Sequence, residues 1–224
     1  MIEQALADLH AAADPARAER DAAYHKAARP YLGVPVPVID SLARGWRAGL
    51  PLDGRIALAA ALWDTDIHEA KVGAAKLLTQ ARIRPDDTAV WDLVASWVPG
   101  FNAWAIADQA CDAGERRLVT DPSRLDLVET WIAHPSFWVR RAALVITLPW
   151  TKQNFPRPAD LAIRDRILGW AAQMADDREW FIQKAIAWWL RDLSRHDPDR
   201  TRAWLARHGG RLKPFALKES QRHL

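Results

Sequence analysis

Trp104 and Asp108 are the pair of residues whose types and spacing could do chemistry. They lie four residues apart in residues 97–112, WVPGFNAWAIADQACD, which otherwise has the pattern of a buried helix. Residues four apart share a helix face, so the indole and the carboxylate point into the same volume. A fixed carboxylate can stabilise a growing positive charge and position a water molecule, and an indole face can add cation–π stabilisation. An ion pair with an arginine or a capping role explains the carboxylate equally simply.

Positive charge is placed unevenly along the chain. Residues 1–100 carry 11 Lys and Arg against 13 Asp and Glu, and residues 101–224 carry 20 against 15. Such an excess suits a polyanion, most simply nucleic acid, and an ordinary solvated surface is equally compatible with it. The 13 tryptophans exceed the usual need of a core of this size, so several rings are expected to line a surface or groove.

The elements that must position these residues are predicted to be short helices. Proline-marked breaks recur along the chain, and the segments between them carry apolar residues at three- and four-residue spacing. Runs rich in β-branched and aromatic residues are few, which argues against strands. The sequence therefore predicts an all-α chain of about 10 to 13 helices. No long flexible linker interrupts it, so residues 1–224 are expected to form a single domain.

The helices also repeat weakly. FWVRRAALV (137–145) aligns with WFIQKAIAW (180–188) at a spacing of 43 residues, with Arg141 over Lys184. Helical-pair repeats of the HEAT type have periods of roughly 40–47 residues. On the same frame, Asp108 takes a slot that holds alanine in the other two segments. The prediction is an α-solenoid of HEAT-like repeats whose curvature gives a concave groove.

The chain resembles the AlkD-type DNA alkylation-repair glycosylases, a HEAT-like-repeat family, over nearly its whole length. The most specific stretch is WFIQKAIAWWLRDLSRHDPD (180–199). One departure is Ala103, where the family often has a second Trp before the one that matches Trp104. Four further segments carry the resemblance: PYLGVPVP (30–37), Trp104-x-x-x-Asp108, Trp138-Val139-Arg140-Arg141 and LKPFALKESQRHL (212–224).

This resemblance implies a DNA glycosylase that removes positively charged alkylpurines, such as 3-methyladenine and 7-methylguanine, from duplex DNA. It implies that the damaged nucleotide is not flipped into a pocket, unlike in most enzymes that act on a base. It assigns Asp108 as the catalytic carboxylate, Trp104 and Trp188 as aromatic contacts to the deoxyribose, and Arg141 as a contact to the flanking backbone. An alkylpurine cation is already a good leaving group, so the carboxylate need only stabilise charge on the sugar.

Four further basic residues are candidates for contacts to DNA phosphates. Arg140 precedes Arg141, and Lys184 shares the repeat frame of Arg141. Lys218 and Arg222 belong to a basic C-terminal segment. Such contacts would be independent of base sequence, although solvated or ion-paired charges on helix surfaces are as common.

No cofactor or metal is implied by the sequence. There is no H-E-x-x-H motif and no glycine-rich phosphate loop. Asp64 and Asp66 are interpreted as an N-cap and a first-turn acid of the following helix, not as a paired-carboxylate site. Cys111, the only cysteine, is interpreted as a small core residue. No apolar run approaches the roughly 20 residues that span a bilayer, and Glu3 stands where a signal peptide carries basic charge, so a cytoplasmic protein without a membrane partner is expected.

Two other functions compete with the glycosylase. A non-catalytic relative could bind damaged or branched DNA through the same groove, and a protein-interaction scaffold is a common use of HEAT-like arrays. Joint retention of Trp104, Asp108, Arg141 and Trp188 favours catalysis, because a scaffold has no reason to keep a carboxylate between indoles. The expected partner is double-stranded DNA with alkylated bases, and the protein is expected to be a monomer. Salt-sensitive DNA binding would separate the glycosylase and the non-catalytic DNA-binding protein from the scaffold.

Overall fold

The structure is a computed structural model that describes residues 1–224. It consists of thirteen α-helices and five short 3-10 helices, and it contains no strand. The prediction of an all-α chain with 10 to 13 short helices is therefore confirmed. None of these helices combines the length and the apolar character that crossing a membrane requires.

Two compact units make up the chain, and we call them the N-terminal unit (Met1–Arg117) and the C-terminal unit (Leu118–Leu224). The division falls inside the helix α7 (Trp104–Thr120). Two compact units can belong to one domain, so the expectation that residues 1–224 form a single domain stays a prediction.

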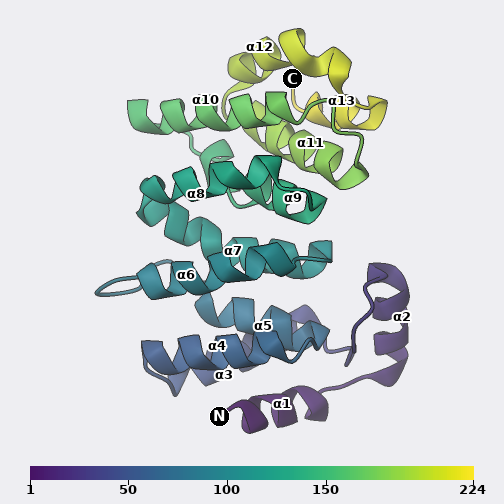
Figure 1. Cartoon of the computed structure of the whole chain (residues 1–224), viewed down its shortest axis with the longest axis vertical. Helices are drawn as coiled ribbons and strands as arrows, with labels where there is room; N and C mark the ends of the chain where they lie inside the picture. The colour runs from purple at the N-terminus through teal and green to yellow at the C-terminus, as the bar shows by residue number, and fades with distance from the viewer. The chain divides into compact units, whose positions relative to one another are not determined.

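In the N-terminal unit, α5 is the central helix. It packs against α3 and α4, and all of its side chains except that of Lys76 are buried (Figure 1). This burial follows from the small residues of HEAKVGAAKLL, which let neighbouring helices approach closely. The helices of the unit are α1 (Ile2–Ala11), α2 (Pro15–His25), α3 (Val36–Ala48), α4 (Leu52–Asp64), α5 (His68–Leu78), α6 (Thr88–Trp97), η1 (Val98–Gly100) and the first part of α7.

A buried carboxylate fixes the turn between α2 and α3. Glu69, which is 1% exposed, accepts hydrogen bonds from the backbone N–H groups of Leu32 and Gly33 at 2.9 and 2.7 Å. Gly33 has φ of +75°, a conformation that glycine adopts at no steric cost. The PYLGV segment thus forms a tight turn that is anchored to the core helix α5.

The interpretation of Asp64 and Asp66 is wrong in its details. Asp64 is the last residue of α4, and the N-cap of α5 is Ile67. Asp66 lies between the helices in a left-handed conformation, with φ of 56°. Its carboxylate is 3.6 Å from both the Arg29 and the Lys71 side chains, so it balances two cations instead of starting a helix.

In the C-terminal unit, α11 is the central helix. It packs against α9, α12 and α13 (Figure 1). The buried guanidinium of Arg164 ties the unit together, because it donates to the carbonyls of Trp150 and Gln153 at 2.7 and 2.8 Å. The helices of the unit are the end of α7, η2 (Pro122–Arg124), α8 (Leu125–Thr130), η3 (Trp131–Ala133), α9 (Phe137–Val145), η4 (Leu148–Thr151), α10 (Pro158–Gln173), α11 (Trp180–Ser194), α12 (Pro198–His208), η5 (Gly209–Arg211) and α13 (Pro214–Ser220).

Most of the tryptophans serve the core. Eight of the 13 are buried, among them Trp189, which has no exposed surface. Cys111 is buried as well, at 2% exposure, in agreement with its interpretation as a core residue. The five tryptophans that keep part of their surface exposed are Trp46, Trp104, Trp138, Trp180 and Trp188. Both rings that the resemblance assigns to the lesion belong to this minority.

Candidate active site and nucleic-acid interface

Helix α7 presents the predicted catalytic pair. Trp104 is its first residue and Asp108 follows one turn later, and both side chains are half-buried. The neighbouring Ala107 and Ala110 are 1% and 0% exposed, so the opposite side of this turn faces the core. In the repeat frame the corresponding Ala142 is also buried, at 1%. The structure thus brings Trp104 and Asp108 together on a helix face that remains accessible.

An aromatic cluster holds the Trp104 ring, and we define it as Tyr24, His25, Tyr31, His68 and Trp104. The Trp104 ring meets Tyr24 edge-on at 5.9 Å and His25 at 5.2 Å between ring centroids. The His25 ring stacks on His68 at 4.8 Å and on Tyr31 at 5.9 Å. Tyr24 is 68% exposed, so the cluster extends from the core to the surface.

The imidazoles of the aromatic cluster are held neutral. Burial lowers the pKa of His68 to about 3, and electrostatic interactions with His25 and Arg29 act in the same direction. Burial also lowers the pKa of His25, against the opposing effects of Asp21 and Glu69. At neutral pH the ring that touches Trp104 therefore brings no positive charge to the site.

Arg29 links this cluster to the start of α7. Its side chain is 1% exposed, and it donates a hydrogen bond to the side-chain oxygen of Asn102, two residues before Trp104. Arg29, Tyr24 and His25 were not predicted from the sequence. The PYLGVPVP resemblance pointed to the adjacent turn, but nothing in the spacing of these residues indicates a contact with a helix so far along the chain.

The predicted arginine pair lies in the middle of α9 in the C-terminal unit. Arg141 is 4% exposed; its guanidinium donates to the carbonyl of Phe181 at 3.3 Å and lies 5.9 Å from the Phe181 ring centroid. Arg140 forms an ion pair with Asp177 at 2.9 Å and donates to two backbone carbonyls at 2.8 Å. Both guanidinium groups are thus held by the unit's own atoms, and their contacts to DNA stay predictions.

Trp188 lies on α11, four residues after Lys184 and hence on the same helix face. Its ring is half-buried, and its indole N–H donates to Asp192 at 3.0 Å. Arg191 donates to the other oxygen of Asp192 at 3.0 Å. The carboxylate thereby fixes the ring and the guanidinium relative to each other.

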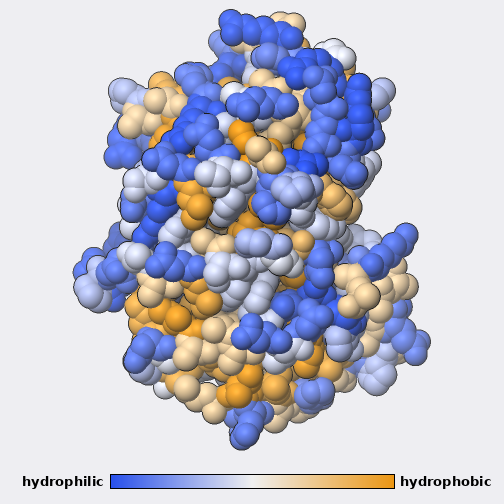
Figure 2. Space-filling view, viewed as in Figure 1, coloured by the Kyte–Doolittle hydropathy of each residue, from blue (hydrophilic) through white to orange (hydrophobic).

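A basic pocket of about 460 Å³ lies between α11 and α13. It brings together three predicted DNA-binding residues, Lys184, Lys218 and Arg222. It also contains Arg191, which was not predicted. Arg191 lies seven residues after Lys184, and hence on the same helix face. Figure 2 shows hydrophilic side chains covering much of the surface around α12 and α13. The six residues that line the basic pocket are Lys184, Arg191, Phe215, Lys218, Glu219 and Arg222.

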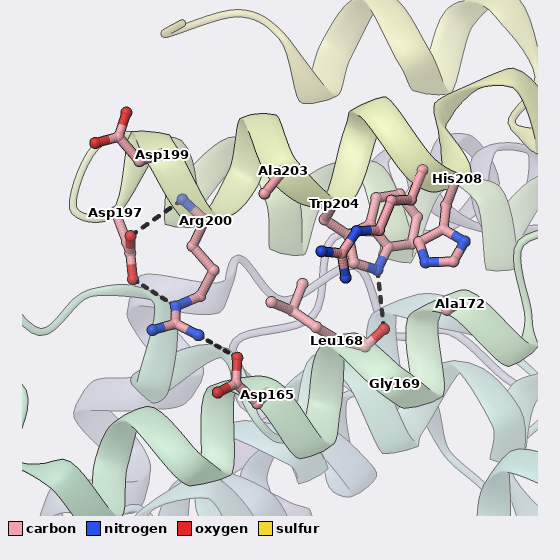
Figure 3. Close-up of a pocket in the computed structure, with 11 residues that line it drawn as sticks. Asp165, Leu168, Gly169, Ala172, Asp197, Asp199, Arg200, Ala203, Trp204 and His208 are labelled. Carbon is pink, nitrogen blue, oxygen red and sulfur yellow. Dashed lines mark hydrogen bonds and ion pairs between the residues drawn. The ribbon is translucent and has the colours of Figure 1, made fainter.

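A larger cavity of about 700 Å³ lies between α10 and α12 and contains none of the predicted site residues (Figure 3). On its floor the Trp204 indole N–H donates to the Leu168 carbonyl at 2.9 Å. At one end Arg200 joins Asp197 to Asp165. These bonds couple the two helices, and we assign them a role in packing.

Trp104 and Asp108 belong to the N-terminal unit, whereas Arg141, Trp188 and the basic pocket belong to the C-terminal unit. The prediction that all of them serve one lesion stays a prediction. No group of three or more His, Cys, Asp or Glu side chains is arranged to hold a metal ion.

Comparison with known proteins places the fold and the family. The structure is similar to one described as a predicted DNA alkylation repair enzyme from Enterococcus faecalis, with a TM-score of 0.79 and 22% identity over 95% of this chain and 96% of that chain. AlkD2 from Streptococcus mutans gives a TM-score of 0.61 and 17% identity over 84% of this chain and 88% of that chain. The protein smu.31 from Streptococcus mutans UA159 gives 0.62 and 17% over 84% and 92%.

These likenesses confirm that the chain has the fold of AlkD-type repeat proteins, as the sequence predicts. The family model described as DNA alkylation repair enzyme matches residues 5–224. The chain therefore belongs to the DNA alkylation repair enzyme family.

Proposed function

We propose that this protein is a DNA glycosylase that excises positively charged N3- and N7-alkylated purines from duplex DNA. Membership of the DNA alkylation repair enzyme family supports action on alkylated DNA. The observation that carries the proposal is the half-buried carboxylate of Asp108, one helical turn after the half-buried ring of Trp104. A carboxylate kept beside an indole on an accessible face suits a cationic reacting centre.

In the proposed reaction the bond between the sugar and the alkylpurine breaks, and its electron pair leaves with the base. The base departs neutral, because alkylation had made it a cation, and positive charge grows on the sugar. Asp108 stabilises this charge electrostatically and positions the water that attacks the sugar carbon and then releases one proton to solvent. Trp104 adds cation–π stabilisation, and the aromatic cluster keeps its ring in place.

Residues of the C-terminal unit would hold the damaged strand. Trp188 would contact the lesion's deoxyribose, while Arg141, Arg140, Lys184, Lys218 and Arg222 would contact phosphates. Following the resemblance, we further propose that the lesion stays in the helix during excision and that the protein acts as a cytoplasmic monomer without a cofactor.

The decisive experiment measures free base released from methylated duplex DNA. We expect the native protein to release 7-methylguanine or 3-methyladenine, and Asp108→Asn to reduce the release rate at least about tenfold, which corresponds to about 1.4 kcal/mol of lost transition-state stabilisation. Asp112→Asn is the matched control. Asp112 lies one turn further along α7, 4.0 Å from Lys76, and its side chain is 52% exposed. Equal loss in both variants would contradict a catalytic role for Asp108.

Failure of the native protein to release base would favour one of the two competing functions. Salt-dependent binding of duplex DNA without base release would indicate the non-catalytic DNA-binding protein. Absence of both binding and release would indicate the interaction scaffold.

A further inference from the structure

One carboxylate in the basic pocket forms ion pairs with two of the pocket's cations. Glu219 contacts the Lys184 ammonium through one oxygen and the Arg191 guanidinium through the other, each at 2.6 Å. The side chain of Glu219 is 16% exposed, whereas those of Lys184 and Arg191 are 36% and 23% exposed, so the carboxylate lies deeper than the cations that it holds. Two oxygens of one anion, each held by a different cation, are also the arrangement that a phosphodiester group offers.

Positive charge still exceeds negative charge around the pocket. Lys218 and Arg222 are exposed at the end of the chain, four residues apart, and they add two cations to those that Glu219 holds. Besides Glu219, Asp192 is the other carboxylate that contacts Arg191, at 3.0 Å. The pocket is thus built to attract an anion from solution although one anion is already inside it.

We infer that the basic pocket is a seat for a backbone phosphate of duplex DNA, and that Glu219 is an internal competitor for this seat. A phosphate that enters binds Lys184 and Arg191 through its two charged oxygens in place of Glu219, while Lys218 and Arg222 contact the next phosphate. The inference rests on the proposed function, because its ligand is duplex DNA.

The position of the seat agrees with this ligand. Lys184 and Arg191 lie on the face of α11 that also presents Trp188, because the three residues are spaced by four and three positions. A strand that contacts the Trp188 ring therefore runs past the basic pocket on the same side of this helix.

The test measures binding of undamaged duplex DNA to the full-length protein by fluorescence anisotropy over a range of salt concentrations. Glu219→Gln removes the competitor and leaves a side chain of the same size. If the protein contacts one more phosphate, the affinity at 0.1 M salt rises about eightfold, and the slope of log affinity against log salt concentration steepens by about 0.9. Glu219→Asp keeps the charge and is expected to bind DNA as the native protein does.

Glu129→Gln is the matched control, because it raises the net charge by the same amount. Like Glu219, Glu129 is held by two side-chain donors, which here are Arg166 and Trp170. Unlike Glu219, it lies outside the basic pocket. Equal tightening in both Gln variants would overturn the inference, since total charge alone would explain it. Weaker binding by a folded Glu219→Gln protein, checked by circular dichroism, would overturn it too.

A last arm replaces chloride by inorganic phosphate at equal ionic strength. If phosphate removes the gain of Glu219→Gln at concentrations that leave native binding unchanged, the seat prefers free phosphate and the inference is overturned. Persistence of the gain supports it. None of these measurements requires base release, so failure of the glycosylase proposal and failure of this inference give different results.

Discussion

At the scale of single residues, the neutral state of His68 has a consequence for stability. The imidazole is 7% exposed and packs against both His25 and Tyr31, each at 4.8 Å between ring centroids. Burial lowers its pKa from 6.5 to about 3. Between these two pH values His68 is therefore protonated in the unfolded chain and neutral in the folded chain. The stability from the neutral ring is present above pH 6.5 and is lost as the pH falls toward 3.

We therefore expect the free energy of unfolding to decrease below pH 6.5 by up to about 1.4 kcal/mol per pH unit from His68 alone. His68→Phe keeps an aromatic ring in the stack and removes the titration. Urea unfolding of both proteins between pH 7 and 4.5 measures the difference, in which the carboxylates common to both cancel. Parallel curves for the two proteins would show that His68 titrates normally in the folded state.

At the scale of elements, the turn before α3 depends on one glycine. A Cβ atom at Gly33 would clash with the Asp14 carbonyl oxygen and come within 2.6 Å of the Ala18 backbone nitrogen, and φ there is +75°. Both neighbours belong to the start of α2, which is tied to this turn by the hydrogen bond from the Asp14 backbone N–H to the Leu32 carbonyl at 2.9 Å. This turn therefore has no room for a side chain at position 33.

Gly33→Ala is expected to destabilise the protein by more than about 1 kcal/mol, through both strain and the clash. Gly45→Ala is its control. Gly45 lies inside α3 with no atom within 4 Å of its added Cβ, so the change is expected to stabilise by roughly 0.5–1 kcal/mol. Chemical denaturation of both variants gives the comparison, and similar effects of the two substitutions would refute the special role of the turn.

The elements themselves were largely predictable, because proline breaks and three- to four-residue periodicity are local signals. The pair Trp104 and Asp108 was predictable for the same reason, since one helical turn fixes their common face. The limits of α4 and α5 near Asp64 were misjudged, because Asp66 takes its position from Arg29 and Lys71. Arg29 was not predictable at all, because its contact with Asn102 joins residues 73 positions apart.

At the scale of the whole molecule, the two units differ in the sign of their charge. The N-terminal unit contains 13 Lys and Arg against 16 Asp and Glu, and the C-terminal unit contains 18 against 12. Binding to phosphates releases condensed counterions and supplies most of the affinity for undamaged DNA. Under the proposed function, the C-terminal unit is therefore the one that supplies general affinity, and the N-terminal unit supplies the carboxylate and ring that act on the lesion.

This division of roles predicts unequal effects of equal charge changes. Lys218→Gln with Arg222→Gln is expected to weaken binding of undamaged duplex DNA by about eightfold at 0.1 M salt for each phosphate that is no longer bound, and to flatten the salt dependence accordingly. Arg82→Gln with Arg84→Gln removes the same charge from exposed positions of the N-terminal unit and is expected to change affinity little. Salt titrations of both double variants make the measurement. Equal weakening would mean that DNA affinity depends on the total charge of the molecule. The expected contrast would locate the DNA-binding surface at α11 and α13.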